Sequence, residues 1–163
     1  MSATSLTVRQ IGGRIGAEIS GVRLSGDLDS QSVASIREAL LAHKVVFFKD
    51  QHLDNDSQRA VLSLFGKVVP SPHTHRYAAP DPEESNRDGA KIETVGDRVA
   101  PAANDRPNHW HSDMTYLANP PGIELLRGVV MPPYGGETAW ANTAAAYQDL
   151  PPVLQNLADE LWA

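Results

Sequence analysis

The residues best suited to chemistry are His111 and Asp113, which lie two positions apart in the segment His109-Trp110-His111-Ser112-Asp113. In a β-strand, side chains at positions i and i+2 point to the same face. If this segment is a strand, an imidazole nitrogen and a carboxylate oxygen lie side by side, as adjacent ligands of an octahedral metal do. Two histidines and one carboxylate on one face of an iron ion leave positions open for oxygen chemistry. We therefore predict a metal site at His111 and Asp113.

His109 is the nearest candidate for a third ligand, but its distance from Asp113 argues against it. Four residues of extended chain span about 13 Å, at about 3.3 Å per residue. Metal–ligand bonds are about 2 Å long, so one ion cannot reach both side chains without a sharp bend in the chain. We expect His109 to be a loop histidine or to lie beside the ligands.

The elements that must position this site begin with a hairpin. Alternating, β-branched sequence over residues 4–11 predicts a strand, Gly12-Gly13 a turn, and residues 15–19 a second strand. A helix, a short buried strand and a second helix are then predicted in turn over residues 28–43, 45–48 and 54–65.

The rest of the chain is predicted to alternate loops and strands before two closing helices. Residues 69–90 and 96–108 are polar and contain proline, and we expect flexible active-site loops there. Strands are predicted over residues 91–95, 109–116, 123–131 and 137–141. Helices are predicted to begin at Asn142 or Thr143 and at Pro151-Pro152.

The last predicted helix carries an apolar stripe close to the end of the chain. Its members are Val153, Leu154, Leu157, Leu161 and Trp162. No capping residue follows them before Ala163. A domain seldom finishes on such a turn, so we expect the chain to be truncated.

The amino-acid composition excludes several classes of protein and of functional site. The chain has 163 residues, 41% hydrophobic and 21% charged, which is ordinary for one globular domain. A formal net charge of −6 disfavours a nucleic-acid partner. There is no cysteine, which excludes a thiolate metal site. Neither a secretion signal nor a membrane-spanning run is visible, so we expect a cytoplasmic protein with no membrane partner.

Two segments carry a resemblance to a known family. Trp110-His111-Ser112-Asp113-Met114-Thr115-Tyr116 resembles the Trp-His-Thr-Asp-x-Thr-Phe signature of the taurine dioxygenase/alkylsulfatase family. Tyr134-Gly135-Gly136-Glu137-Thr138-Ala139-Trp140 resembles that family's Gly-Gly-x-Thr-x-Trp block, and the spacing from His111 to Thr138 fits. The family consists of iron(II)- and 2-oxoglutarate-dependent dioxygenases.

The resemblance implies a fold and a set of site residues. The fold would be mixed α+β, a double-stranded β-helix (jelly-roll, cupin-like) with flanking helices, and residues 1–163 would be the N-terminal portion of this single domain. His111 and Asp113 would bind Fe(II), and Thr138 would hydrogen-bond 2-oxoglutarate. Ser71 and His73 are candidates for substrate contact, although solvated loop residues are the plainer interpretation of His73 and of His75.

The same resemblance implies an oxygenase reaction. The complete enzyme would use O2 and 2-oxoglutarate to hydroxylate a small anionic substrate, an alkyl sulfate or a taurine-like sulfonate. The product would break down to an aldehyde and sulfate or sulfite.

The chain differs from the family because some of the family's site residues are missing from it. The family's third iron ligand is a later histidine, followed by arginines that bind 2-oxoglutarate. Here no histidine follows His111, and the last arginine is Arg127. Alternatives therefore stay open: a truncated, non-catalytic remnant, or half of a split enzyme with a complementing C-terminal half. A homo-oligomer is a further open alternative for the partners of the chain. A zinc hydrolase using His109, His111 and Asp113 is disfavoured by distance.

Overall fold

The computed structural model describes residues 6–69, 110–135 and 137–161. Two compact units are formed by these residues. One unit combines Met1–Leu53 with Arg127–Ala163, and the other is Asp54–Leu126.

The first unit is built on a small sheet with the order β1-β2-β3. Strands β1 (Thr7–Gln10) and β2 (Ala17–Ser20) pair antiparallel, with Val8 opposite Ile19. The turn between them closes through a 3.0 Å hydrogen bond from Ile11 N–H to the carbonyl of Gly16. Gly16 has φ +97°, and a Cβ there would lie 3.2 Å from the Ile11 side chain, so both conformation and space favour glycine.

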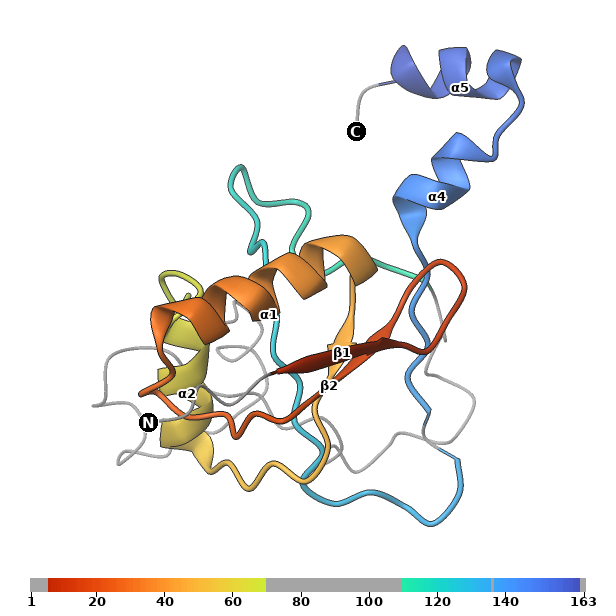
Figure 1. The fold of residues 1–163 in the computed structure, drawn as a ribbon. Coiled ribbons are helices and arrows are strands. Elements are labelled where there is room, and N and C mark those ends of the chain that lie inside the picture. Colours follow the sequence, from red (N-terminus) through yellow and green to blue (C-terminus); the bar gives the residue numbers. More distant parts are fainter. Residues whose placement is uncertain (1–5, 70–109, 136, 162–163) are drawn as a thin grey trace, which may run out of the picture. The chain divides into compact units, whose positions relative to one another are not determined.

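Helix α1 (Ser30–His43) connects β2 to the parallel strand β3 (Val46–Phe47). It packs against both strands and lies across the sheet (Figure 1). Burial explains the placement, because the helix contributes Ile36 and Ala39 to the core while β2 contributes Ala17 and Ile19. The helix end is joined directly to the hairpin, since the Gly16 N–H donates to the His43 carbonyl at 2.9 Å.

Helices α4 (Thr143–Gln148) and α5 (Pro152–Asp159) belong to the same unit. Asn142 caps α4 through a 3.0 Å hydrogen bond from Ala145 N–H, and its amide donates to the Arg14 carbonyl at 2.9 Å. An ion pair joins Arg14 to Asp149. The start and end of α4 are therefore tied to the hairpin turn that contains Arg14.

The second unit contains helix α2 (Asn55–Ser63). Asp54 and Ser57 form a capping box in which each side chain accepts from the other's backbone N–H, both at 2.8 Å. Val61 and Gln58 are the buried residues of the helix, with exposed fractions of 2% and 6%. The Gln58 amide donates to the Leu125 carbonyl at 3.1 Å, which ties α2 to the segment before Arg127.

The predicted hairpin, the two N-terminal helices, the short strand between them and the two closing helices are confirmed, with bounds shifted by a few residues. The later strand predictions are wrong, because residues 110–116, 123–131 and 137–141 form no strand. A jelly-roll is consequently not seen in the described part of the chain, whose sheet has three strands. Predictions for residues 70–109, including the strand at 91–95 and nearly all of both loops, lie outside the described residues.

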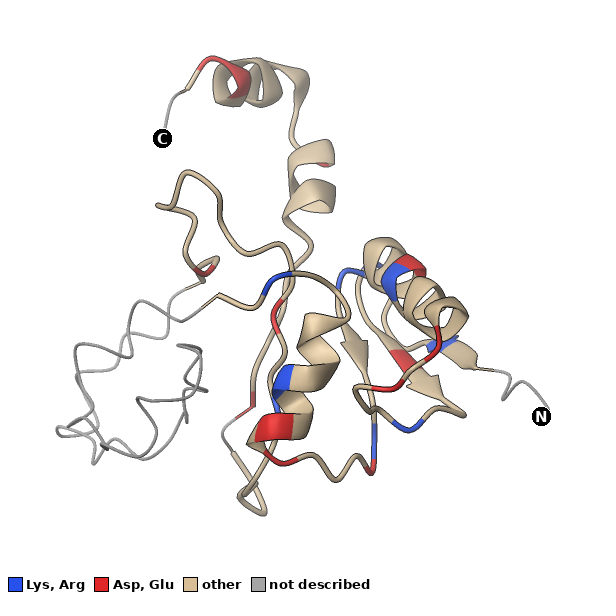
Figure 2. Ribbon diagram, turned by 90° about the vertical axis from the view of Figure 1, so that its left-hand side faces the viewer, with Lys and Arg blue, Asp and Glu red and all other residues tan. Residues whose placement is uncertain are grey.

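Acidic and basic side chains are interspersed over α1 and α2, whereas residues 128–135 carry no charged side chain and α4 and α5 carry no basic one (Figure 2). Within the described residues, no helix has the length and apolar character needed to cross a membrane.

Candidate metal centre

The side chains of His111 and Asp113 meet in the second unit. His111 Nε2 lies 3.2 Å from Asp113 Oδ1, and the two side chains are 70% and 54% exposed. The local backbone differs from the predicted strand. Met114 adopts φ +53°, and the Leu117 N–H donates to the Met114 carbonyl at 3.0 Å, so a turn follows the pair directly. The two side chains thus lie together in a loop that leads into a turn.

The spacing of these two atoms suits a shared octahedral metal ion. Two ligand atoms at about 2.1 Å from one ion, at right angles to each other, are about 3.0 Å apart. The observed 3.2 Å is close to that value. A neutral imidazole nitrogen and a carboxylate oxygen are also a donor set that iron(II) accepts. His111 and Asp113 therefore fit two adjacent positions of such an ion.

A second carboxyl group, that of Glu124, lies near the pair. It lies close enough to Asp113 and His111 for their charges to act on its carboxyl group. Partial burial, and then the nearby negative charge of Asp113, hold the pKa of Glu124 above its ordinary value of 4.5, against a smaller opposing effect of His111. Nevertheless, no set of three His, Asp or Glu side chains in the described ranges is arranged to hold a metal. The described residues supply at most two ligands.

Sequence reasoning missed Glu124. A signal was available, because Glu124 and Arg127 are the only charged residues in the apolar run from Ile123 to Met131. A carboxyl group in an apolar run is apt to be partly buried, and burial is the main cause of the raised pKa of Glu124.

Of the other predicted site residues, the structure describes Thr138. It is exposed and belongs to the first unit, whereas His111 and Asp113 belong to the second. Ser71, His73, His75 and His109 lie outside the described residues. The roles of all these residues stay predictions.

Trp140, two residues beyond Thr138, packs edge-on against Phe47 of β3, with ring centroids 5.4 Å apart. It remains 43% exposed. Trp140 is thus a partly buried neighbour of the sheet.

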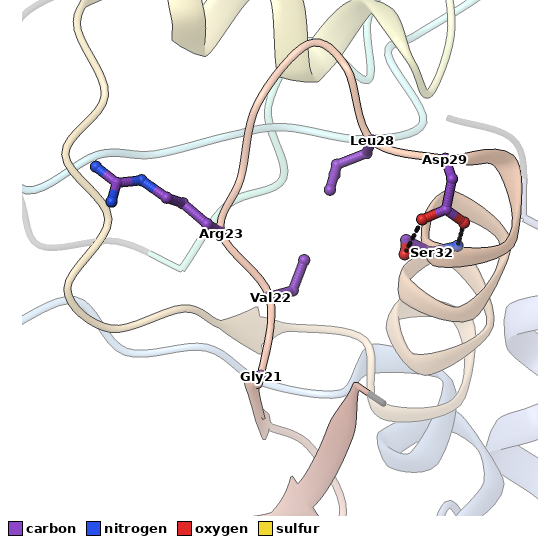
Figure 3. Close-up of a pocket in the computed structure, with 6 residues that line it drawn as sticks. All are labelled: Gly21, Val22, Arg23, Leu28, Asp29 and Ser32. Atoms are coloured by element: carbon purple, nitrogen blue, oxygen red, sulfur yellow. Dashed lines mark hydrogen bonds between the residues drawn. The ribbon is translucent and has the colours of Figure 1, made fainter. Parts of the chain in front are cut away.

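A shallow cavity of about 260 Å³ lies at the start of α1, lined by Gly21, Val22, Arg23, Leu28, Asp29 and Ser32 (Figure 3). Asp29 is already engaged, because both its carboxylate oxygens accept from Ser32, at 2.9 and 2.8 Å. The lining contains no histidine, and its one carboxylate is already hydrogen-bonded. The cavity therefore does not offer the nitrogen and oxygen donors found at His111 and Asp113.

Comparison with known proteins places these features in a family. Residues 7–163 match the model of the taurine catabolism dioxygenase TauD, TfdA family. The chain is 46% identical, over 99% of its length, to an alpha-ketoglutarate-dependent sulfate ester dioxygenase of Pseudomonas putida. It is 43% identical, over 97% of its length, to an alkylsulfatase of Acinetobacter baylyi.

Solved structures agree. A crystal structure of a taurine dioxygenase from Burkholderia xenovorans superposes with a TM-score of 0.76 at 35% identity, over 96% of this chain and 51% of that one. The chain likewise spans 50% of the Pseudomonas relative and 46% of the Acinetobacter relative. With a family model matched over almost its whole length, the chain belongs to the TauD/TfdA family of dioxygenases.

Proposed function

We propose that this chain forms part of an iron(II)- and 2-oxoglutarate-dependent dioxygenase that acts on small alkyl sulfate esters. The observation that carries the proposal is the 3.2 Å pairing of His111 Nε2 with Asp113 Oδ1, in a chain 46% identical to a sulfate ester dioxygenase. A taurine-like sulfonate is the related substrate class, as the name of the Burkholderia structure suggests.

Each candidate site residue of this chain has a role that follows from its chemistry. His111 and Asp113 hold the metal through one nitrogen and one oxygen. The Thr138 hydroxyl donates a hydrogen bond to a carboxylate of 2-oxoglutarate, and Ser71 and His73 contact the anionic end of the substrate. The bound iron supplies the chemistry that couples O2 and 2-oxoglutarate to C–H hydroxylation, and the protein supplies positioning and exclusion of water.

The overall reaction balances as follows. One oxygen atom of O2 enters succinate, which forms with CO2 from 2-oxoglutarate, and the other becomes a hydroxyl group on the carbon that bears the sulfate. That hydroxyl then loses its proton as the carbon–oxygen bond to sulfate breaks, which gives an aldehyde and hydrogen sulfate. With a sulfonate, the carbon–sulfur bond breaks instead and sulfite leaves.

A complete site needs more than this sequence contains. The chain spans about half the length of the curated relatives it matches, and it contains no histidine after His111 and no arginine after Arg127. We therefore propose that the third iron ligand and the arginines for 2-oxoglutarate come from a complementing C-terminal half, and that without it the chain is a non-catalytic piece.

The test is 2-oxoglutarate-dependent formation of succinate and sulfate from a short alkyl sulfate. The chain is assayed alone and together with a polypeptide that corresponds to the remaining half of the Pseudomonas relative. We expect turnover only in the mixture. His111→Ala or Asp113→Ala should abolish that turnover and lower iron occupancy, because each removes one ligand atom.

His52→Ala provides the matched control, because His52 is an exposed histidine in the first unit. It should leave turnover and metal content unchanged. Full iron occupancy in the Asp113→Ala mixture would contradict the assigned ligands. Absence of turnover in a stable mixture would favour the non-catalytic remnant, and zinc in place of iron on metal analysis would favour a hydrolase.

A further inference from the structure

We propose that the apolar side of α5 is the surface on which the complementing C-terminal half docks. Four side chains make up this surface, which we call the α5 stripe: Val153, Leu154 and Leu157 of the helix, and Leu161 two residues beyond it. This assignment rests on the proposed function, which requires the second half as a partner. It adds the place on this chain where that partner binds.

The described part of the chain leaves the α5 stripe uncovered. All four side chains are 44–71% exposed, and α5 has no buried residue. The helical turn continues past Asp159, because the Leu161 N–H donates to the Ala158 carbonyl at 3.2 Å. With about 3.6 residues per turn, the four positions therefore fall on one side of the helix. An amphipathic helix normally buries such a side, so the α5 stripe is an apolar surface that needs a partner.

The opposite side of α5 is held by α4. The Gln155 amide donates to the carbonyls of Tyr147 and Gln148, both at 3.1 Å. The Tyr147 hydroxyl donates to Asp159 Oδ1 at 2.7 Å. Gln155 and Asp159 are four residues apart and so share one side of the helix, the side away from the α5 stripe. The polar side of α5 thus faces its neighbour, which leaves the apolar side open for docking.

The α4–α5 pair is tied to the hairpin turn before any partner binds. Asn142 caps α4 and donates to the Arg14 carbonyl at 2.9 Å, and Arg14 forms an ion pair with Asp149 at the end of α4. A surface that is already positioned loses less conformational entropy on binding. The α5 stripe is therefore well placed to bind a partner segment.

The relatives contain about as much sequence again as the part to which this chain corresponds. The chain aligns over 99% and 97% of its length to two relatives of which it spans 50% and 46%. It spans 51% of the Burkholderia dioxygenase structure. The rest of such a protein is a partner of sufficient length to cover α5, and a segment of it is the occupant of the α5 stripe.

The charge of this end of the sequence favours that half over a second copy of the chain. Residues 141–163 contain three acidic side chains, Asp149, Asp159 and Glu160, and no basic one. A second copy would bring the same acidic side chains to the contact. The proposed C-terminal half contains arginines, whose charge is complementary to that of this end.

The experiment co-expresses the full chain with an affinity-tagged polypeptide that corresponds to the remaining half of the Pseudomonas relative. The amount of chain recovered with the tag is measured, and we expect a complex of one chain with one tagged half. Val153→Glu should lower the recovery by about 10-fold or more, because it places a charge in an apolar contact. Position 153 is in the first turn of α5, where a negative charge suits the helix dipole, so the helix itself is retained.

Asn156→Glu is the matched control, because it adds the same charge at an exposed position of α5 outside the stripe. It should leave the recovery unchanged, as should Leu157→Met, which keeps an apolar side chain of similar volume. Parent-level recovery of Val153→Glu would overturn the inference. So would a parent chain that forms homodimers and recovers none of the tagged half, since a second copy would then be the occupant.

A second measurement does not depend on loss of binding. The chain contains no cysteine, so Leu157→Cys can be labelled with a photoreactive maleimide at one position. Illumination should crosslink the labelled chain to the tagged half. Leu41→Cys, at an exposed position of α1, should crosslink less. Crosslinking from position 41 and not from position 157 would place the partner elsewhere and refute the docking surface.

The proposed function and the docking surface can fail separately. If Val153→Glu keeps parent-level recovery and turnover in the mixture, the docking surface alone is refuted. If the two halves form a complex that depends on the α5 stripe and yet convert no alkyl sulfate, the proposed function is refuted and the docking surface stands.

Discussion

Two carboxyl groups of the first unit, those of Asp29 and Glu18, form short contacts that lower their pKa values. Asp29 accepts two hydrogen bonds from Ser32 at the start of α1 (Figure 3). These bonds, first of all the one from the Ser32 backbone, hold the pKa of Asp29 below its ordinary value of 3.8. Glu18 contacts Lys49 at 3.0 Å and Arg9 at 2.8 Å, and these partners, Lys49 foremost, lower the pKa of Glu18.

The cap at Asp29 predicts a dependence of stability on pH. A carboxyl group with a lowered folded-state pKa adds stability above its unfolded pKa, near 3.8, and this stability is lost as pH falls through the lower folded value. Urea unfolding at pH 7 and at about pH 3 should therefore show a smaller acid loss for Asp29→Asn than for the parent chain. Asp29→Ala should be less stable at both pH values, because it has no acceptor.

Asp27→Asn is the control for this measurement, since it alters a nearby exposed aspartate outside the cap. Its loss of stability on acidification should match that of the parent chain. An Asp29→Asn chain that loses as much stability in acid as the parent would show that the cap does not set this part of the pH profile.

The candidate site illustrates what sequence reveals at the scale of residues. The approach of His111 to Asp113 followed from their spacing of two, which places side chains close in many loop conformations as well as in a strand. The proximity of Glu124 did not follow, because it depends on how a later segment returns to the turn at Met114. Contacts of this kind are set by tertiary structure, on which spacing carries no information.

At the scale of elements, helices were predicted better than strands for a physical reason. α1 and α2 satisfy their own backbone hydrogen bonds and carry side-chain caps at Asp29 and Asp54, both readable from local sequence. The predicted strands after residue 109 need partners for their backbone groups. Apolar alternation identifies a segment that suits a sheet but does not identify its neighbour, and residues 123–131 pair with no strand in the described ranges.

The packing of α1 on the sheet gives a prediction for this element. Ile36 is 3% exposed on the face that packs against β2 and β3. Ile36→Ala should lower the free energy of unfolding by about 2–5 kcal/mol, because it removes buried methyl groups and leaves a cavity. Urea unfolding followed by circular dichroism measures the change.

Leu41→Ala is the matched control on the same helix, since Leu41 is 67% exposed. Its effect should remain within about 0.5 kcal/mol. Equal losses for the two variants would indicate that α1 does not bury the face containing Ile36.

At the scale of the whole chain, apolar side chains remain exposed near the C-terminal side of the sequence. On α5, Val153, Leu154 and Leu157 are 44–71% exposed, and Leu161, two residues beyond the helix, is 69% exposed. Val129, Val130 and Met131 are 68–87% exposed. Exposed apolar side chains promote association between proteins. We expect the isolated chain to self-associate at micromolar concentrations unless a partner covers these side chains.

Leu157→Glu tests this expectation, because it places a charge in the middle of the α5 stripe. Sedimentation velocity should show a shift from larger species towards monomer. Asn156→Glu adds the same charge beside the stripe and should leave the distribution of species close to that of the parent chain. A parent chain that is monomeric at all concentrations would refute the expectation.

One contact has a bearing on how the family can vary. The Arg127 guanidinium donates to the carbonyl of Leu53. The chain leaves the first unit after Leu53 and re-enters it 74 residues later at Arg127, so this hydrogen bond holds the two ends of the intervening segment together. Lengthening a loop whose ends are already fixed costs little, about 0.6 kcal/mol for each doubling of its length. Changes of length between α2 and the His111–Asp113 pair can therefore be accommodated without displacing the three-stranded sheet.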